Sequence, residues 1–187
     1  MKFRHLSVAV VALLVFAAGA GAKAAWTPYS APVDGFTISF PGAPKVASEK
    51  SAATVDGLYR TYSVDLSTSA FLVSVLHYPT ASTPPATDAT YRAFLNSYAG
   101  GSACAIKTTR DLRIAGRPAL EAVCLDAKAK IDHIVDAFLN GDYLYIVVSA
   151  GPKGYAKGAT AARFRDSFSF QPVVTPVPPQ PSASPVP

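Results

Sequence analysis

The sequence predicts an α+β fold, in which helices flank a mainly antiparallel β-sheet. Strand-like runs are separated by dipeptides that accept positive φ, and this arrangement is typical of hairpins. Two other stretches have the apolar spacing of amphipathic helices. The runs 71–76 and 145–148 are apolar on both alternating faces, so the sheet must be covered on both sides. A β-sandwich without helical cover is the alternative.

Four short strands and a helix are predicted in the first half of the chain. Asp34-Gly35 precedes the first strand, and a turn at 56–57 joins the second to the third. The helix begins at Thr87 or Asp88, which are suited to cap it, and ends at 100–101 with two glycines. The predicted strands are 36–40, 46–54, 58–67 and 71–76. The apolar face of the helix consists of Tyr91, Phe94, Leu95 and Tyr98.

Two hairpins and a second helix are predicted in the second half. The hairpins pair 104–114 with 119–126, around Ala115-Gly116, and 131–139 with 143–150, around Asn140-Gly141. The helix runs from about Tyr155 to Ser167, and Gly158 makes its first turn uncertain because glycine disfavours a helix interior. Strands, helix, four strands and helix is the order of an antiparallel sheet with helices on its faces.

Residues 1–24 are predicted to be a secretory signal peptide, so the protein is expected to be periplasmic or secreted. A basic start is followed by the apolar run 6–18 and then by small residues in an A-x-A pattern. Cleavage is expected after Ala24, with Ala22 as the second choice. An uncleaved membrane anchor is the alternative, but the apolar run is shorter than the roughly 20 residues that span a bilayer. We therefore expect no stable membrane insertion.

The rest of the chain divides into one domain and a tail. Residues 25–171 have the size of a single domain that buries its own core. Residues 172–187 contain seven prolines and no charged residue, which predicts a disordered, Pro-rich tail of polyproline II character. We expect a spacer that is dispensable for folding; docking of the tail in an aromatic groove of a partner is the alternative.

The charge of the chain argues against nucleic acid as a partner. The formal net charge is +5, and removing Lys2, Arg4 and Lys23 with the signal peptide lowers it by three to +2. The remaining cations are scattered along the sequence, whereas a nucleic-acid interface needs a clustered basic face.

Cys104 and Cys124 predict a disulfide, because an even number of cysteines in an exported chain is typical of an oxidising compartment. A metal site with His77 and His133, or a free thiol, is the alternative, but the cysteines lack the close C-x-x-C spacing of zinc sites. In the predicted hairpin, a register whose paired positions sum to 228 places Cys104 opposite Cys124.

No catalytic constellation is predicted. His133 lies between Asp132 and Asp136, but strand alternation places both aspartates on the opposite face of the sheet. His77 continues the apolar face of the strand 71–76. A histidine on such a face is more often a core residue than a catalyst.

Two further patterns have a binding interpretation and a simpler one. The glycine-rich, basic stretch 151–158 would suit an anion at a helix N-terminus, but it lacks the P-loop spacing, and a surface loop explains it equally well. Four tyrosines would suit an aromatic pocket, although half-buried strands favour tyrosine anyway. They are Tyr59, Tyr62, Tyr143 and Tyr145.

Short motifs along nearly the whole domain carry a family resemblance. They are Trp26-x-x-Tyr29, Asp34-Gly35-Phe36-x-Ile38-x-Phe40-Pro41-Gly42, Gly116-Arg117-Pro118-Ala119-x-Glu121, Tyr143-Leu144-Tyr145 and Arg163-Phe164-x-x-Ser167-Phe168. The series resembles the PsbP-like and DcrB-like group of small exported bacterial proteins. The resemblance implies an α/β/α sandwich, and the named members of the group are accessory proteins. Because the matching residues are turns and core aromatics, it implies no catalytic residue.

Together, these observations predict a non-catalytic accessory or binding protein of the bacterial cell envelope. Its partner is expected to be another envelope protein, no cofactor or metal is expected, and the oligomeric state is left open. The first alternative is a carrier of a small apolar ligand, suggested by the aromatic content. The second is a hydrolase in which Ser63 or Ser74 meets a histidine only in three dimensions, since no G-x-S-x-G motif is present.

Overall fold

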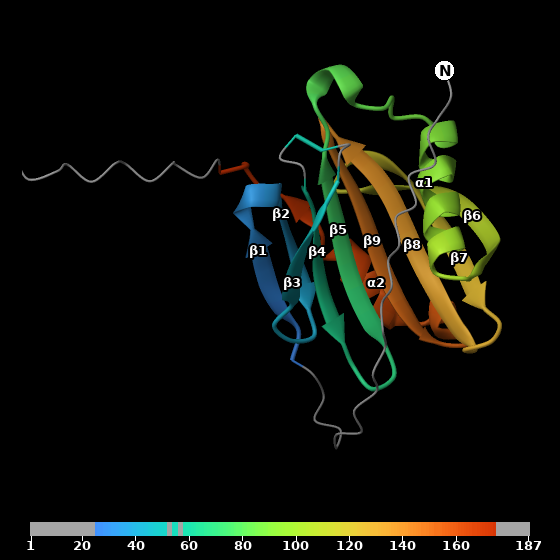
Figure 1. The fold of residues 1–187 in the computed structure, drawn as a ribbon. Coiled ribbons are helices and arrows are strands. Elements are labelled where there is room, and N and C mark those ends of the chain that lie inside the picture. The colour runs from blue at the N-terminus through green and yellow to red at the C-terminus, as the bar shows by residue number, and fades with distance from the viewer. Residues whose placement is uncertain (1–24, 52–53, 56–57, 175–187) are drawn as a thin grey trace, which may run out of the picture.

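The structure is a computed structural model that describes residues 25–51, 54–55 and 58–174 (Figure 1). The predicted signal peptide, the turn at 56–57 and residues 175–187 of the predicted tail lie outside the described residues. Within the described ranges, no helix is long and apolar enough to cross a membrane.

A seven-stranded antiparallel sheet forms the centre of the molecule (Figure 1). Neighbouring strands follow the order β3-β4-β5-β9-β8-β7-β6, so β3 and β6 are its edges. Most neighbours are consecutive strands. The turn chemistry predicted the pairs β3–β4, β6–β7 and β8–β9, and these are confirmed. The strands are β3 (Lys45–Lys50), β4 (Leu58–Asp65), β5 (Ala70–His77), β6 (Ala105–Ile114), β7 (Arg117–Asp126), β8 (Ile131–Asn140) and β9 (Tyr143–Pro152).

A small second sheet and two helices cover the large sheet. Helix α1 (Asp88–Gly101), capped by Thr87, packs on one face against β6, β7 and β8. The other face carries α2 (Ala159–Asp166) and the small sheet, in which β2 lies between β1 and β10 (Figure 1). The small-sheet strands are β1 (Thr27–Ala31), β2 (Phe36–Phe40) and β10 (Ser169–Phe170), and the 3₁₀ turns are η1 (Pro32–Asp34), η2 (Thr80–Ser82) and η3 (Tyr155–Lys157). The predicted mainly antiparallel α+β fold with helices on both faces is confirmed.

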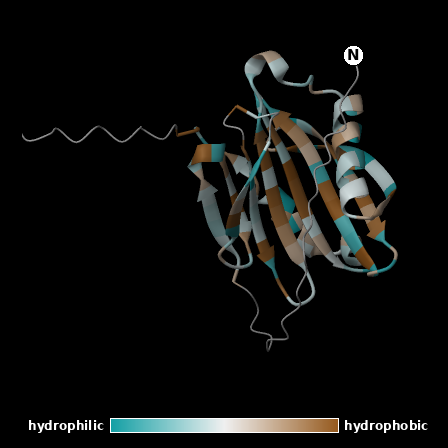
Figure 2. Cartoon of the chain, in the orientation of Figure 1, coloured by the Kyte–Doolittle hydropathy of each residue, from teal (hydrophilic) through white to brown (hydrophobic). Residues whose placement is uncertain are grey.

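Two apolar cores lie on opposite faces of the large sheet, and the central strands β5 and β9 are mostly apolar on both sides, as Figure 2 shows. The core under the small sheet is rich in aromatic rings. Its largest fully buried members are Phe36, Phe40, Phe71, Phe138, Tyr145 and Phe164. The core under α1 includes Tyr91, Leu95, Leu120 and Leu144.

Asp34 fastens the small sheet to the large one. Its fully buried carboxylate accepts hydrogen bonds from Arg60 (2.8 Å) and Tyr62 (2.5 Å) on β4, and its carbonyl accepts one from the Tyr145 hydroxyl (2.8 Å). Gly35 then adopts a left-handed conformation with φ of 68°, which glycine adopts at little steric cost. The Asp34-Gly35 turn is therefore held by both sheets.

The predicted second helix is divided at Gly158. Tyr155–Lys157 form only the 3₁₀ turn η3, and α2 begins at Ala159, because Gly158 is extended (φ −86°, ψ 157°) and its N–H bonds to the Tyr155 carbonyl. Glycine favours this break, because it loses more conformational freedom than any other residue when it is held in a helix interior. The predicted start of the helix at Tyr155 was therefore wrong.

Candidate functional site

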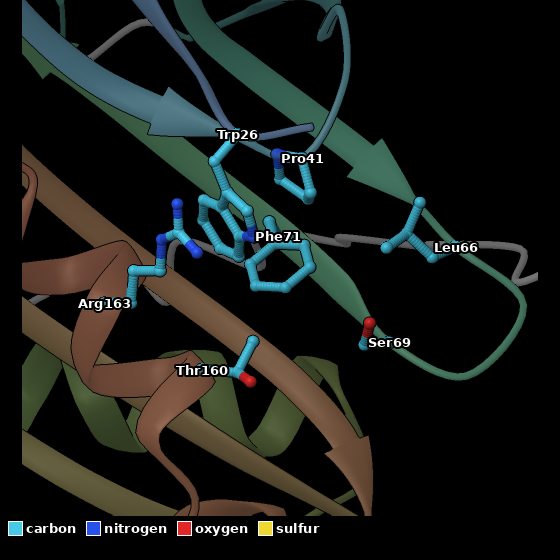
Figure 3. A pocket seen from close by; sticks show the side chains of 7 residues that line it. All are labelled: Trp26, Pro41, Leu66, Ser69, Phe71, Thr160 and Arg163. Carbon is cyan, nitrogen blue, oxygen red and sulfur yellow. The ribbon is translucent and has the colours of Figure 1, made fainter. Parts of the chain in front are cut away.

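A shallow cleft of about 350 Å³ opens where four distant segments meet. They are the residue before β1, the end of β2, the β4–β5 loop with the start of β5, and the solvent-facing side of α2 (Figure 3). The cleft is lined by Trp26, Pro41, Leu66, Ser69, Phe71, Thr160 and Arg163.

Strand pairing places the aromatic floor of the cleft. Thr27 pairs with Phe40, so the preceding Trp26 lies beside Pro41, which follows β2. The indole of Trp26 contacts Phe71 edge to face, with 5.2 Å between ring centroids. Beneath them, the fully buried Phe164 of α2 packs on Phe71 at 5.1 Å. The floor is thus continuous with the aromatic core and is held rigidly by it.

Hydrogen-bond donors stand on the rim of this floor. The guanidinium carbon of Arg163 lies 4.8 Å from the centroid of the Trp26 ring, a cation–π contact (Figure 3). The hydroxyls of Ser69 and Thr160 line the same cleft, and none of the described residues that line it is acidic. This combination suits a ligand group with an apolar body and exposed oxygen acceptors. A nucleophile paired with a base is not among the lining residues.

A second cluster, the buried charged cluster, lies on the same face of the large sheet. Glu121 of β7 and Asp136 of β8 are cross-strand neighbours, and both are buried. Arg110 of β6 donates to both oxygens of Glu121 (2.5 and 2.9 Å), and Arg165 of α2 donates to Glu121 Oε2 (2.7 Å). The cluster therefore ties α2 to the large sheet.

Asp136 is the unusual member of the buried charged cluster. Its Oδ1 is buried without a hydrogen-bond partner. Burial, reinforced by the charge of Glu121, raises the pKa of Asp136 to about 8, and Arg165 and Arg110 only partly oppose this shift. Asp136 thus keeps its proton at neutral pH. Because the carboxyl group is only 2% exposed, it has no access to a substrate from solvent.

The histidines have internal roles outside the cleft. Nδ1 of His133 lies 2.9 Å from the hydroxyl of Tyr98 on α1, and burial lowers the pKa of His133. His77 stacks on Tyr143, with 4.1 Å between ring centroids. As predicted, Asp136 lies on the opposite face from His133. Ser74 and His77 also occupy opposite faces of β5.

Backbone N–H groups of the glycine-rich loop 151–158 donate hydrogen bonds within the protein. Gly154 N–H bonds to the Asp132 carboxylate (2.6 Å), and Lys153 N–H bonds to the Lys130 carbonyl (2.9 Å). A carboxylate thus occupies the place that an anion would need, and this supports the surface-loop interpretation. Nor do the four tyrosines line a common pocket, because Tyr62 and Tyr145 fill the core while Tyr59 bonds to Glu49. Tyr143 stacks on His77.

The structure contains the predicted disulfide between Cys104 and Cys124, whose Cα atoms are 5.6 Å apart. The predicted register was wrong. Ile114 pairs with Arg117, and after a bulge between Ile106 and Thr108 it is Ile106 that lies opposite Cys124. Cys104 precedes β6, where the chain leaves α1, and reaches Cys124 from there. The bond occupies both cysteines of the chain and is typical of an oxidising compartment.

A metal centre receives no support from the part of the chain that the structure describes, where no three His, Cys, Asp or Glu side chains converge. Neither the cleft nor the buried charged cluster is marked as a site by a local pattern in the sequence. Trp26, Arg163 and Glu121 belong to the motifs of the resemblance, which was the only signal that pointed to them. Arg165 and Arg110 carried none.

Comparison with known proteins supports the fold and leaves the site unassigned. No protein-family model matches the chain, and no curated protein matches it in sequence. Among solved structures, it is similar to the solution structure of cyanobacterial PsbP (CyanoP) from Synechocystis sp. PCC 6803. The likeness has a TM-score of 0.53 at 14% identity and covers 82% of this chain and 97% of that one. The domain therefore has a PsbP-like fold.

Proposed function

We propose that the protein is a non-catalytic, exported accessory protein of the bacterial cell envelope, and that its cleft binds a partner protein. The PsbP-like fold and the disulfide support this proposal. The observation that carries it is the contact between Trp26 and Arg163 at the cleft. Tryptophan and arginine dominate the binding energy of protein interfaces, because each combines a large apolar surface with directed hydrogen bonding.

Photo-crosslinking in the native envelope tests the proposal. Leu66, at the cleft, is replaced by the photoreactive amino acid p-benzoylphenylalanine, and the matched control carries it at Val46 on the exposed edge strand β3. We expect one envelope protein to be cross-linked from position 66 and not from position 46. Identical adducts from both positions, or none from position 66, would contradict the proposal.

The carrier of a small apolar ligand is the second candidate, and the apolar lining of the cleft favours it. Trp26, Pro41, Leu66 and Phe71 contribute this lining, and the volume lies at the lower end of the roughly 300–1,000 Å³ of ligand sites. Native mass spectrometry of protein purified from its own compartment tests it. A bound mass that Leu66→Ser removes and Val46→Ser retains would support a carrier, whereas a clean unliganded mass would count against it.

A further inference from the structure

The segment that follows the described domain has the chemistry of a polyproline ligand. Residues 175–187 contain six prolines in thirteen residues, no charge, and two overlapping P-x-x-P patterns at 176–179 and 178–181. Proline-rich segments favour the polyproline II helix, which leaves every backbone carbonyl free to accept a hydrogen bond. Such helices bind grooves that combine aromatic rings with hydrogen-bond donors, because little conformational entropy is lost on binding.

The cleft offers that combination. Trp26, Phe71 and Pro41 present flat apolar surfaces against which proline rings pack, and Arg163 and Thr160 supply donors for the free carbonyls. Among the described residues, none that lines the cleft is acidic, so none of them opposes the carbonyls of an incoming chain.

The segment also starts within reach of the cleft. Val174 N–H bonds to the Pro32 carbonyl at the end of β1, whereas Trp26 precedes the start of β1. The distance along β1 is roughly 20 Å at ~3.3 Å per residue. Thirteen residues in polyproline II span roughly 40 Å at ~3.1 Å per residue. The segment 175–187 is therefore long enough to run back along β1, an edge strand of the small sheet, and enter the cleft.

We propose that the Pro-rich segment 175–187 of the same chain docks in the Trp26–Phe71 cleft and competes there with the partner. This inference rests on the proposed function, because it regulates access to the same site. It makes the segment an internal, displaceable occupant of the cleft.

A spin label on the segment tests the docking in the intact chain. Trp26 is the only tryptophan in the sequence, so its indole N–H gives a single side-chain NMR signal. Because Cys104 and Cys124 are joined in a disulfide, Ser182→Cys introduces the one free thiol to which the spin label attaches. We expect a nitroxide at position 182 to broaden the Trp26 signal at least severalfold, and reduction of the nitroxide to restore it. Replacement of Pro176, Pro178, Pro179 and Pro181 by serine should abolish the broadening without touching the folded domain.

Variants in the cleft and a mixing experiment show whether the Pro-rich segment of the same chain occupies the cleft. Leu66→Ser in the cleft should weaken the broadening, whereas Val46→Ser on β3 should not. An unbroadened Trp26 signal, or equal broadening in the serine-substituted tail, overturns the proposal. Broadening that arises only when spin-labelled and isotope-labelled chains are mixed also overturns it, because a second copy is then the occupant. If the spin label shows no docking but position 66 still cross-links one envelope protein, the docking proposal fails and the proposed function stands. If position 66 cross-links only to the Pro-rich segment, the proposed binding of a partner protein fails and the docking proposal stands.

Discussion

Replacing Asp136 by asparagine should stabilise the protein at neutral pH. The buried carboxyl group keeps its proton up to about pH 8 in the folded state, whereas the unfolded chain releases it near pH 3.8. Each pH unit between these values costs about 1.4 kcal/mol of folding free energy. At pH 7 the cost is therefore roughly 4 kcal/mol as an upper bound. Asp136→Asn has nearly the same shape and no proton to lose, so it avoids this cost.

The pH dependence has a definite sign. The stability that protonated Asp136 provides is fully present below about pH 4 and is lost progressively as the pH rises towards 8, because the folded state binds the extra proton. We expect Asp136→Asn to match the parent chain near pH 4 and to exceed it by about 2–4 kcal/mol at pH 7. The lower value allows for the second N–H of the asparagine amide, which the protonated carboxyl group lacks and which must also be buried.

Urea unfolding of both proteins between pH 4 and pH 8 measures the difference. Asp65→Asn, at an exposed position of β4, is the matched control and should change the free energy of unfolding by less than about 0.5 kcal/mol. A loss of stability in Asp136→Asn at pH 7 would refute the reasoning. It would mean that Asp136 is ionised in the folded protein and that Arg165 or Arg110 needs its charge.

Three further predictions concern stability and are checked by thermal unfolding. Cys104→Ser should lower the Tm by several degrees, because closing the loop between the cysteines stabilises the folded state by about 3 kcal/mol. Reductant added to this variant should not lower the Tm further, and an unchanged Tm in the variant would show that the bond does not stabilise the fold. Gly35→Ala should cost about 1–3 kcal/mol, because φ is 68° and the new Cβ would lie 2.8 Å from Val173; a neutral result would refute the strain. A chain ending at Gln171 should be about 1 kcal/mol less stable than one ending at Val174, which retains the bond to the Pro32 carbonyl, and equal Tm values would contradict this.

The sequence predicted those elements whose signals are local. Helix α1 begins after Thr87 and ends at Gly101, since a cap, an apolar stripe and two glycines all lie within one short stretch. The break at Gly158 needed knowledge of a single residue's conformation, which propensity alone does not determine. The disulfide partners followed from there being only two cysteines, yet their strand register did not. The two-residue turn at 115–116 already sets Ile114 opposite Arg117, and the bulge in β6 then moves only the pairs near Cys124, by one residue.

The cleft and the buried charged cluster could not be predicted from local sequence patterns, because their residues come together only in the folded chain. Glu121 and Asp136 become neighbours only through the pairing of β7 with β8. Arg165, which bonds to Glu121, lies on α2, 44 residues after Glu121 in the sequence. The cleft joins Trp26 to Arg163 across almost the whole domain. Neither site has a spacing in the sequence that marks it, because each is assembled by tertiary packing.

The small sheet unites the two ends of the domain, and this has a consequence for the order of folding. β2 pairs with β1, its neighbour in sequence, and also with β10 near the end of the domain. The pairing of Phe36 with Phe170 therefore requires that β10 has been synthesised. We expect the α1 side of the large sheet to form first, because α1 packs against β6, β7 and β8, which follow it closely in sequence. We therefore expect the aromatic core under the small sheet to close last, once β10 has paired with β2.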